Sequence, residues 1–261
     1  IGRWYQKKYI ILSQLGKGGT ARVYLAVEMK SRDIVALKIS DNISSLNREY
    51  NIMKLLSANS FSPHVYEIDD FEAGNCTYHY IAMEYIQGIT LKELIDKELD
   101  IRAIISIIKI LAVIINVLHK NGYIYCDLKP ENIIYDKKEM RIVLIDYGGV
   151  VKRGSGVVEF TPTFDRCSWG IGTRLADESY DIFALCMLLV ILLNRRVYSP
   201  SKQELNNILN KISVSGMGFI RNGLTLKYKN IAEFYKDMES LKYTQNIVKD
   251  RKYEKMLNSL L

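Results

Sequence analysis

The first third of the chain carries short runs of β-branched and aromatic residues, separated by glycine, asparagine and charged positions. Residues 9–15 and 21–27 flank the turn GKGGT, a composition typical of a β-hairpin. Similar runs at residues 34–39, 65–71 and 78–85 predict three more strands. A small, mainly antiparallel sheet is therefore expected at the amino-terminal end.

Helical spacing of apolar residues appears once between the third and fourth strands, at residues 45–56, and becomes dominant from residue 91 onwards. The spacing predicts a short helix over 91–96 and a long one over 101–119, which is apolar nearly all round. That run and the run at 182–193 each fall short of about 18 uninterrupted apolar residues. We therefore expect both to be buried helices, and the chain as a whole to be α+β.

Composition is consistent with a folded chain of 261 residues, 48% of them apolar, which can bury one core or two packed lobes. The four cysteines form no C-x-x-C pair and there are three histidines, so neither a disulfide framework nor a zinc site is indicated. A reducing cytoplasmic location is expected. Because the first residue is Ile1, the sequence is interpreted as a fragment or a processed form.

The formal charge of +7 is unevenly distributed. From Asn194 to the end there are 13 Lys and Arg against 6 Asp and Glu, whereas the preceding residues carry 23 of each kind. This basic carboxyl-terminal region predicts contact with a polyanion, either DNA or an anionic membrane surface. The alternative is an ordinary solvated helical surface.

The stretch YCDLKPEN combines a carboxylate, an ammonium group and an amide, in the form of Asp127, Lys129 and Asn132. Phosphoryl transfer uses a carboxylate to orient the attacking hydroxyl, cations on the phosphate oxygens, and a metal ion that bridges them. The three side chains fit these needs. A polar turn that caps a helix would be the alternative.

This stretch resembles the catalytic loop of protein kinases, and other kinase motifs follow in order over nearly the whole chain. The chain is most similar to bacterial, eukaryotic-like (Hanks-type) serine/threonine protein kinases, and residues 164–184 resemble those of spore-forming bacteria. The resemblance implies Asp127 as catalytic base, Lys129 beside the transferred phosphate, and Asn132 as a metal ligand. Lys129, two residues after Asp127, distinguishes the Ser/Thr type from tyrosine kinases.

The turn LGKGGTARV resembles the glycine-rich loop of kinases, with Ala21 in place of the third glycine, and YIAMEYIQG resembles the strand and hinge that contact adenine. On this resemblance Met83 is the gatekeeper, the backbones of Glu84 and Ile86 bind adenine, and Ile134 forms the pocket floor. The residues implied to bind the nucleotide are Leu15, Gly16, Lys17, Gly18, Gly19, Thr20, Val23, Ala36, Lys38, Met83, Glu84, Ile86 and Ile134.

Four further positions complete the implied machinery. Lys38, in the motif VALK, should reach the phosphates and pair with Glu49 of the following helix. Asp146 of DYG is the second metal ligand, and Thr161 should bond the catalytic Asp and Lys. Asp181 should bond the backbone of the catalytic loop. The implied cofactors are ATP and Mg²⁺, with Mn²⁺ as a substitute.

Two departures from the kinase pattern carry predictions. Tyr125 and Cys126 replace the His and Arg of H-R-D, and that Arg clamps an activation-segment phosphate in many kinases. We therefore expect activity without phosphorylation of this segment. At residues 166–168, where A-P-E is usual, the sequence reads RCS, so the sequence does not indicate how the segment is anchored.

The predicted organisation is an N-lobe at 1–86, a C-lobe at 87–241 and a basic extension at 242–261. The expected function is transfer of the ATP γ-phosphate to Ser or Thr hydroxyls of proteins, including the kinase itself. A pseudokinase scaffold and a small-molecule kinase are the alternatives. The resemblance also suggests a role in sporulation and a membrane helix beyond these residues, and no oligomeric state is indicated.

Overall fold

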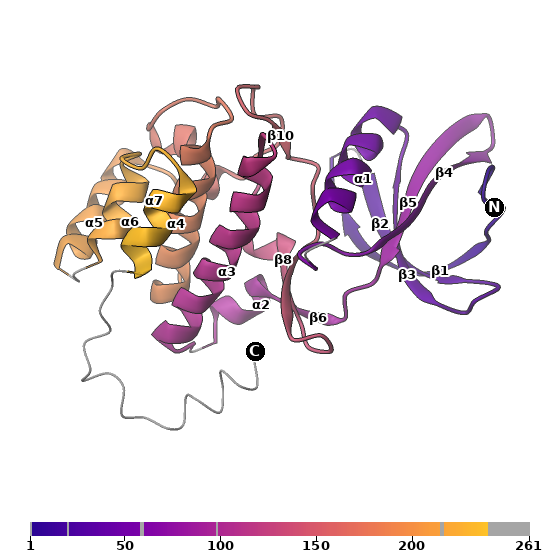
Figure 1. Ribbon diagram of the computed structural model, residues 1–261, viewed down its shortest axis with the longest axis horizontal. Helices are drawn as coiled ribbons and strands as arrows, with labels where there is room; N and C mark the ends of the chain where they lie inside the picture. The colour runs from indigo at the N-terminus through magenta and orange to yellow at the C-terminus, as the bar shows by residue number, and fades with distance from the viewer. Residues whose placement is uncertain (1, 20, 58–59, 98, 215–216, 240–261) are drawn as a thin grey trace. The chain divides into compact units, whose positions relative to one another are not determined.

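The computed structural model of the chain describes five stretches, residues 2–19, 21–57, 60–97, 99–214 and 217–239 (Figure 1). The chain divides into two compact units. The first comprises Ile1–Gln87 with Val143–Gly148, and the second comprises Gly88–Ile142 with Gly149–Leu261. The basic extension predicted at residues 242–261 lies outside the described residues.

Residues 143–148 differ from the sequence-based division, which assigned them to the second lobe. They group with the first unit. Hydrogen bonds explain the grouping, because the Leu144 N–H donates to the Phe61 carbonyl at 3.0 Å and the Arg48 guanidinium donates to the Gly148 carbonyl at 3.0 Å. These hydrogen bonds thus hold residues 143–148, which include the DYG motif, in the first unit.

The first unit is built on a five-stranded sheet in which all neighbours are antiparallel. In spatial order its strands are β1 (Tyr9–Lys17), β2 (Ala21–Glu28), β3 (Ile34–Ser40), β5 (Cys76–Glu84) and β4 (Val65–Ala73). Each predicted strand is present and most extend by one or two residues. The high content of β-branched and aromatic residues accounts for this, since such side chains pack well on a pleated surface.

Helix α1 (Ile43–Ser57) lies against β4 and β5 (Figure 1). Its apolar residues Leu46, Ile52, Met53 and Leu56 are buried at helical spacing, and Glu49 is buried on the same side. An acidic residue on an apolar face is expensive unless it is paired. This position of Glu49 therefore points to a partner within the first unit.

The second unit is mainly helical. Its helices are α2 (Leu91–Ile95), α3 (Ile101–Lys120), α4 (Glu178–Asn194), α5 (Lys202–Val214), α6 (Gly218–Leu224) and α7 (Ile231–Glu239). Helix α4 is the core element, because every residue from Tyr180 to Leu192 is buried and α3, α6 and α7 all contact it (Figure 1). The α+β class predicted from the sequence is confirmed.

By length and composition alone, helix α3 could cross a membrane. Half of its most apolar 18-residue segment is buried within the protein. Its buried residues include Ile108, Leu111 and Ile115, and it packs against α4. The Asp100 carboxylate caps it by accepting from the Arg102 N–H at 3.0 Å. These contacts agree with the sequence-based interpretation of a buried core helix.

Short strands lie on either side of the YCDLKPEN stretch. Strand β6 (Gly88–Thr90) pairs with β8 (Ile133–Asp136), β9 (Arg141–Leu144) follows β8, and β7 (Tyr123–Ile124) pairs with β10 (Val151–Lys152). Gly88 is required by close approach, because a Cβ there would lie 2.2 Å from the Tyr135 carbonyl oxygen. The YCDLKPEN stretch starts directly after β7 and ends at β8.

Candidate active site

In the first unit the predicted pair of Lys38 and Glu49 is present. The Lys38 ammonium lies 2.5 Å from Glu49 Oε2 and 2.9 Å from Asp146 Oδ1. Lys38 and Glu49 are 7% and 3% exposed, whereas the Asp146 side chain is 38% exposed. One buried ammonium therefore joins β3, α1 and the DYG motif.

Burial opposes the charged form of Lys38, but the nearby carboxylates of Asp146 and Glu49 outweigh it and raise the pKa of this lysine above its ordinary value. The ammonium is therefore charged throughout the neutral range. A fixed cation beside a partly exposed carboxylate is an arrangement suited to phosphate oxygens and a divalent cation.

Gly16 at the end of β1 and Gly19 in the turn before β2 are not required by the chain's own packing. A Cβ added at Gly16 or Gly19 would meet no atom within 4 Å, and neither residue has a positive φ. Glycine here leaves open space beside the backbone, which is what close approach of a phosphate needs. Lys17 and Leu15 are exposed on the same strand end, and Thr20 lies outside the described residues.

The residues implied to contact adenine are brought together by strand register. Ala36 lies opposite Met83 across the β3–β5 pair, and Val23 lies opposite Lys38 across the β2–β3 pair. Ala36 and Met83 are 6% and 4% exposed. Strand pairing thus brings Val23 of β2 and Met83 of β5 next to residues of β3.

One hinge prediction becomes more specific. The Glu84 N–H donates to the His64 carbonyl at 2.8 Å, so a ligand contact of the Glu84 backbone must use its carbonyl oxygen. Ile86 is 6% exposed and follows the end of β5. Ile134, implied as the pocket floor, belongs to the second unit, where it lies opposite Thr90 in the β6–β8 pair.

In the second unit Asp127 is the centre of a compact polar group and is 5% exposed. The Thr161 hydroxyl donates to Asp127 Oδ1 at 3.0 Å, and the Lys129 ammonium pairs with Oδ2. Asn132 Nδ2 donates to the Asp127 carbonyl at 3.0 Å and to Oδ2 at 3.2 Å. The carboxylate is held at both oxygens. The amide oxygen of Asn132 is a group of the kind that Mg²⁺ prefers as a ligand.

A nearby glycine makes room for this carboxylate. A Cβ added at Gly149 would lie 2.9 Å from Asp127 Cβ. No group of three or more His, Cys, Asp or Glu side chains suited to a metal ion occurs among the residues that the structure describes. The two predicted metal ligands, Asn132 and Asp146, belong to different units.

The loop before Asp127 is shaped by Asp181 of α4, as the sequence predicts. Asp181 is fully buried and accepts from the backbone N–H of Tyr125 at 2.8 Å and of Cys126 at 2.9 Å. Cys126 has φ 66°, a left-handed conformation that costs energy for a residue with a side chain. These two bonds from a buried carboxylate stabilise the strained turn that presents Asp127.

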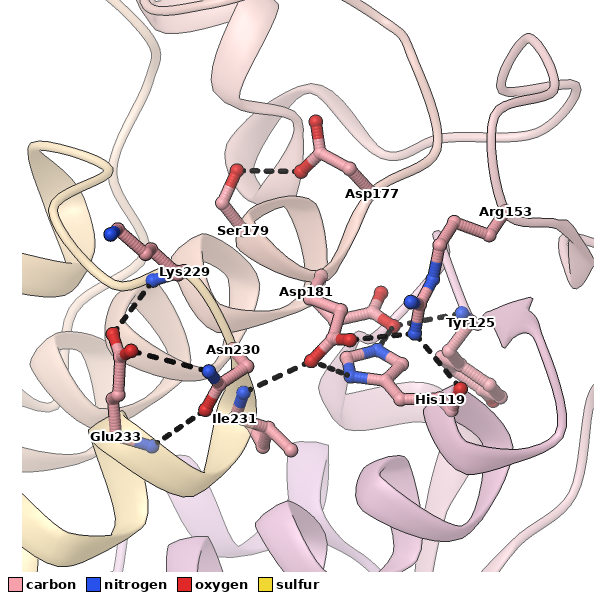
Figure 2. A network of polar contacts seen from close by, with 11 residues as sticks. His119, Tyr125, Arg153, Asp177, Ser179, Asp181, Lys229, Asn230, Ile231 and Glu233 are labelled. Carbon is pink, nitrogen blue, oxygen red and sulfur yellow. Dashed lines mark hydrogen bonds and ion pairs between the residues drawn. The ribbon is translucent and has the colours of Figure 1, made fainter.

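Sequence reasoning missed the role of His119. Its ring nitrogens lie 2.9 Å from Asp181 Oδ2 and 3.2 Å from Glu178 Oε2, and the residue is 3% exposed (Figure 2). Glu178 also pairs with Arg153 at 2.6 Å and accepts from the Ile231 N–H at 3.1 Å. A lone histidine at the end of an apolar helix gives no signal in the sequence, because its partners lie about 60 residues away.

The comparisons with known proteins decide the family. The family model described as protein kinase domain matches residues 9–258. The chain belongs to the protein kinase family. This kinase is 34% identical over 248 residues to the serine/threonine-protein kinase YabT of Bacillus subtilis. The aligned residues cover 91% of this chain and 72% of YabT.

A second relative is the serine/threonine-protein kinase PrkC of Bacillus subtilis, 30% identical over 217 residues, which cover 76% of this kinase but 32% of PrkC. The granulovirus kinase PK-1 of Cydia pomonella has a similar structure, with a TM-score of 0.70, 20% identity, and coverage of 90% and 94% of the two chains. That likeness shows the fold. The relatives support an ATP-dependent serine/threonine protein kinase, and the pseudokinase alternative is not favoured.

The family uses ATP and Mg²⁺, and the residues present fit both. When bound, ATP supplies the phosphoryl group and Mg²⁺ neutralises its oxygens. Open space at Gly16 and Gly19, the charged Lys38 and the partly exposed Asp146 match a triphosphate and its metal ion.

Proposed function

We propose that this kinase phosphorylates Ser and Thr hydroxyls of proteins, itself included, with Asp127 as the base that orients the hydroxyl and accepts its proton. The main support is the way Asp127 is held, with Thr161 on one oxygen and Lys129 and Asn132 on the other. A carboxylate fixed in this way loses little entropy when an acceptor binds. Lys129 stabilises the charge that develops on the transferred group.

The remaining roles follow from charge and position. Lys38, aligned by Glu49, binds phosphate oxygens, while Asp146 and the amide oxygen of Asn132 bind the metal ion. The glycine turn and the residues of the Ala36–Met83 pair bind the rest of the nucleotide.

The direct test is mass spectrometry after incubation with Mg·ATP, with a mixed protein acceptor, a tyrosine peptide and small alcohols offered in parallel. We expect phosphate on Ser and Thr of the protein acceptor and of the kinase. Transfer only to a small alcohol would instead support the small-molecule kinase, and no transfer to any acceptor would support a scaffold.

We also propose that activity does not require phosphorylation of the activation segment. Cys126 stands where the phosphate-clamping arginine is usual, and burial together with the Asp181 charge raises the pKa of its thiol well above the ordinary value. A thiol is neutral when protonated and anionic when ionised, so this position supplies no cation in either form. Ser155→Ala and Thr163→Ala, prepared without exposure to ATP, should each retain nearly full activity in a peptide phosphorylation assay.

Thr161→Ser provides the matched control, since it keeps the hydroxyl that donates to Asp127. The proposal is wrong if Ser155→Ala or Thr163→Ala abolishes transfer and an acidic replacement at the same position restores it. Thr163 also donates to the Tyr198 carbonyl at 3.1 Å, so its melting temperature must be measured alongside activity.

The basic carboxyl-terminal region supports a further proposal, recruitment by a polyanion. Between Asn194 and Leu261 the excess of Lys and Arg is seven, which equals the net charge of the whole chain. Counterion release makes such binding fall steeply with salt. We expect binding to duplex DNA or to anionic vesicles in about 50 mM salt that is lost as salt rises.

Titrations with DNA and with vesicles, run separately, distinguish the two polyanions. Neutral vesicles and a chain that ends at residue 239 are the controls. Absence of binding to both polyanions at low salt would count against recruitment.

For location we propose the cytoplasm, where ATP is available. The four cysteines are all free in the structure, and Cys126 and Cys186 are buried, a usage suited to a reducing compartment. The resemblance to kinases of spore-forming bacteria adds the proposal that a membrane helix beyond these residues tethers the kinase. Cell fractionation of the full-length protein against residues 1–261 tests both statements.

A further inference from the structure

We propose that two crossed ion pairs, Asp165–Arg174 and Arg166–Asp177, position the acceptor-binding part of the activation segment, and that they do so without phosphorylation. Adjacent residues of opposite charge each pair with an opposite charge further along the chain. We call these four residues the crossed clamp. The inference rests on the proposed function, because it assigns the clamp to holding Thr161 against the base Asp127.

Arg166 is 3% exposed and uses all of its donor groups. Its Nη1 and Nη2 donate to the two Asp177 oxygens at 2.9 and 2.8 Å. Nε donates to the Thr173 carbonyl at 2.9 Å, Nη2 also to the Leu175 carbonyl at 3.1 Å, and Nη1 also to Ser179. A bidentate pair with this many bonds fixes position as well as charge.

Asp165 is fully buried and equally well bonded. Arg174 donates to its Oδ2 through Nε at 3.0 Å and Nη2 at 2.8 Å, and the Tyr180 hydroxyl donates to Oδ1 at 2.8 Å. The N–H groups of Cys167 and Ser168 donate at 3.2 and 3.0 Å. Burial opposes ionisation, yet hydrogen bonds from Ser168, Tyr180 and Arg174 lower the pKa of this carboxyl.

The crossed clamp is connected to the catalytic base from both sides. The Thr161 carbonyl accepts from the Asp165 N–H at 3.0 Å, and the Thr161 hydroxyl donates to Asp127. On the other side Asp177 precedes α4, whose Asp181 holds the backbone just before Asp127 (Figure 2). A continuous series of contacts therefore runs from Asp127 through Thr161 and the crossed clamp to Asp181, and from Asp181 back to the backbone before Asp127.

All four charged groups of the crossed clamp are ordinary side chains of this protein and need no added phosphate. Both cations and both carboxylates are present before any modification, so the segment can be held in place as soon as the protein folds. The crossed clamp also explains how the segment is anchored without an A-P-E motif. The sequence did not indicate either ion pair, because Asp165-Arg166 and Arg174 to Asp177 match no motif that predicts a partner.

The test uses Arg174, whose side chain is 41% exposed, so that the fold survives its replacement. Arg174→Gln leaves Asp165 bonded to Tyr180, Ser168 and two backbone N–H groups. We expect kcat for a Ser/Thr peptide to fall between about 10- and 100-fold, with a higher KM for the peptide, because misplacement by about 1 Å costs this much. KM for ATP should stay near that of the wild type, while the melting temperature should fall, because the buried Asp165 keeps its other hydrogen bonds but loses its counter-charge.

Arg174→Lys keeps the charge and should recover part of the loss. Lys109→Gln, which removes the α3 ion pair with Glu239, is the matched control and should leave the kinetics unchanged. Hydrogen exchange gives a second measurement that needs no activity, with faster exchange expected at the amides of residues 161–170 in Arg174→Gln.

Three results would overturn the inference: unchanged peptide kinetics in Arg174→Gln, equal changes in KM for ATP and for peptide, or unchanged exchange at residues 161–170. If the wild type transfers no phosphate, the proposed function fails, and the exchange measurement still decides whether the crossed clamp holds the segment.

Discussion

Asp127→Asn is expected to lower kcat for peptide phosphorylation by about 10²- to 10⁴-fold, the usual contribution of a positioned general base. The amide has nearly the same shape and its oxygen can still accept from Thr161, but its NH₂ group cannot accept from Lys129 and Asn132, so a small local rearrangement is expected beside the loss of the base. The amide cannot take up the hydroxyl proton. ATP binding, measured by equilibrium titration, should change little, since the substitution does not alter the first unit.

The matched control is Asp100→Asn, the same substitution at the N-cap of α3. Asn caps a helix as well as Asp does. That variant should match the wild type. Undiminished transfer by Asp127→Asn would mean that another residue is the base or that a contaminating kinase produces the signal.

Lys38→Met is expected to abolish measurable transfer and also to destabilise the first unit. The buried Glu49 carboxylate and Asp146 lose the cation that lies 2.5 and 2.9 Å from them. Breaking a buried ion pair from one side typically costs about 3–5 kcal/mol. Denaturant unfolding should therefore show a lower midpoint.

A double variant separates the catalytic effect from the structural one. Lys38→Met/Glu49→Met replaces both buried charges by apolar groups of similar length, which should restore much of the stability. Transfer should stay absent, because no ammonium is left for phosphate oxygens. Activity recovered together with stability would show that Lys38 acts only as a structural residue.

Several features of this kinase could be predicted because they depend on local signals. The hairpin around GKGGT and the long apolar helix before the YCDLKPEN stretch follow from spacing and residue type, and the pairing of Lys38 with Glu49 was implied by the resemblance to kinases. The position of Asp181 was predicted from the family pattern, and its bonds to Tyr125 and Cys126 agree.

Other features could not be predicted, because their partners are set by packing. His119 meets Asp181 only after α3 and α4 lie side by side. The grouping of residues 143–148 with the first unit depends on backbone bonds to Phe61 and from Arg48. Such contacts carry no periodicity and no spacing rule.

The sequence by itself predicted the order of strands and helices and the resemblance to protein kinases, since periodicity and short motifs are properties of neighbouring residues. Tertiary structure alone decided which charges face each other. Asp165 and Arg166 acquire their meaning from Arg174 and Asp177, because a buried charge is tolerated only where folding brings its counter-charge within hydrogen-bonding distance.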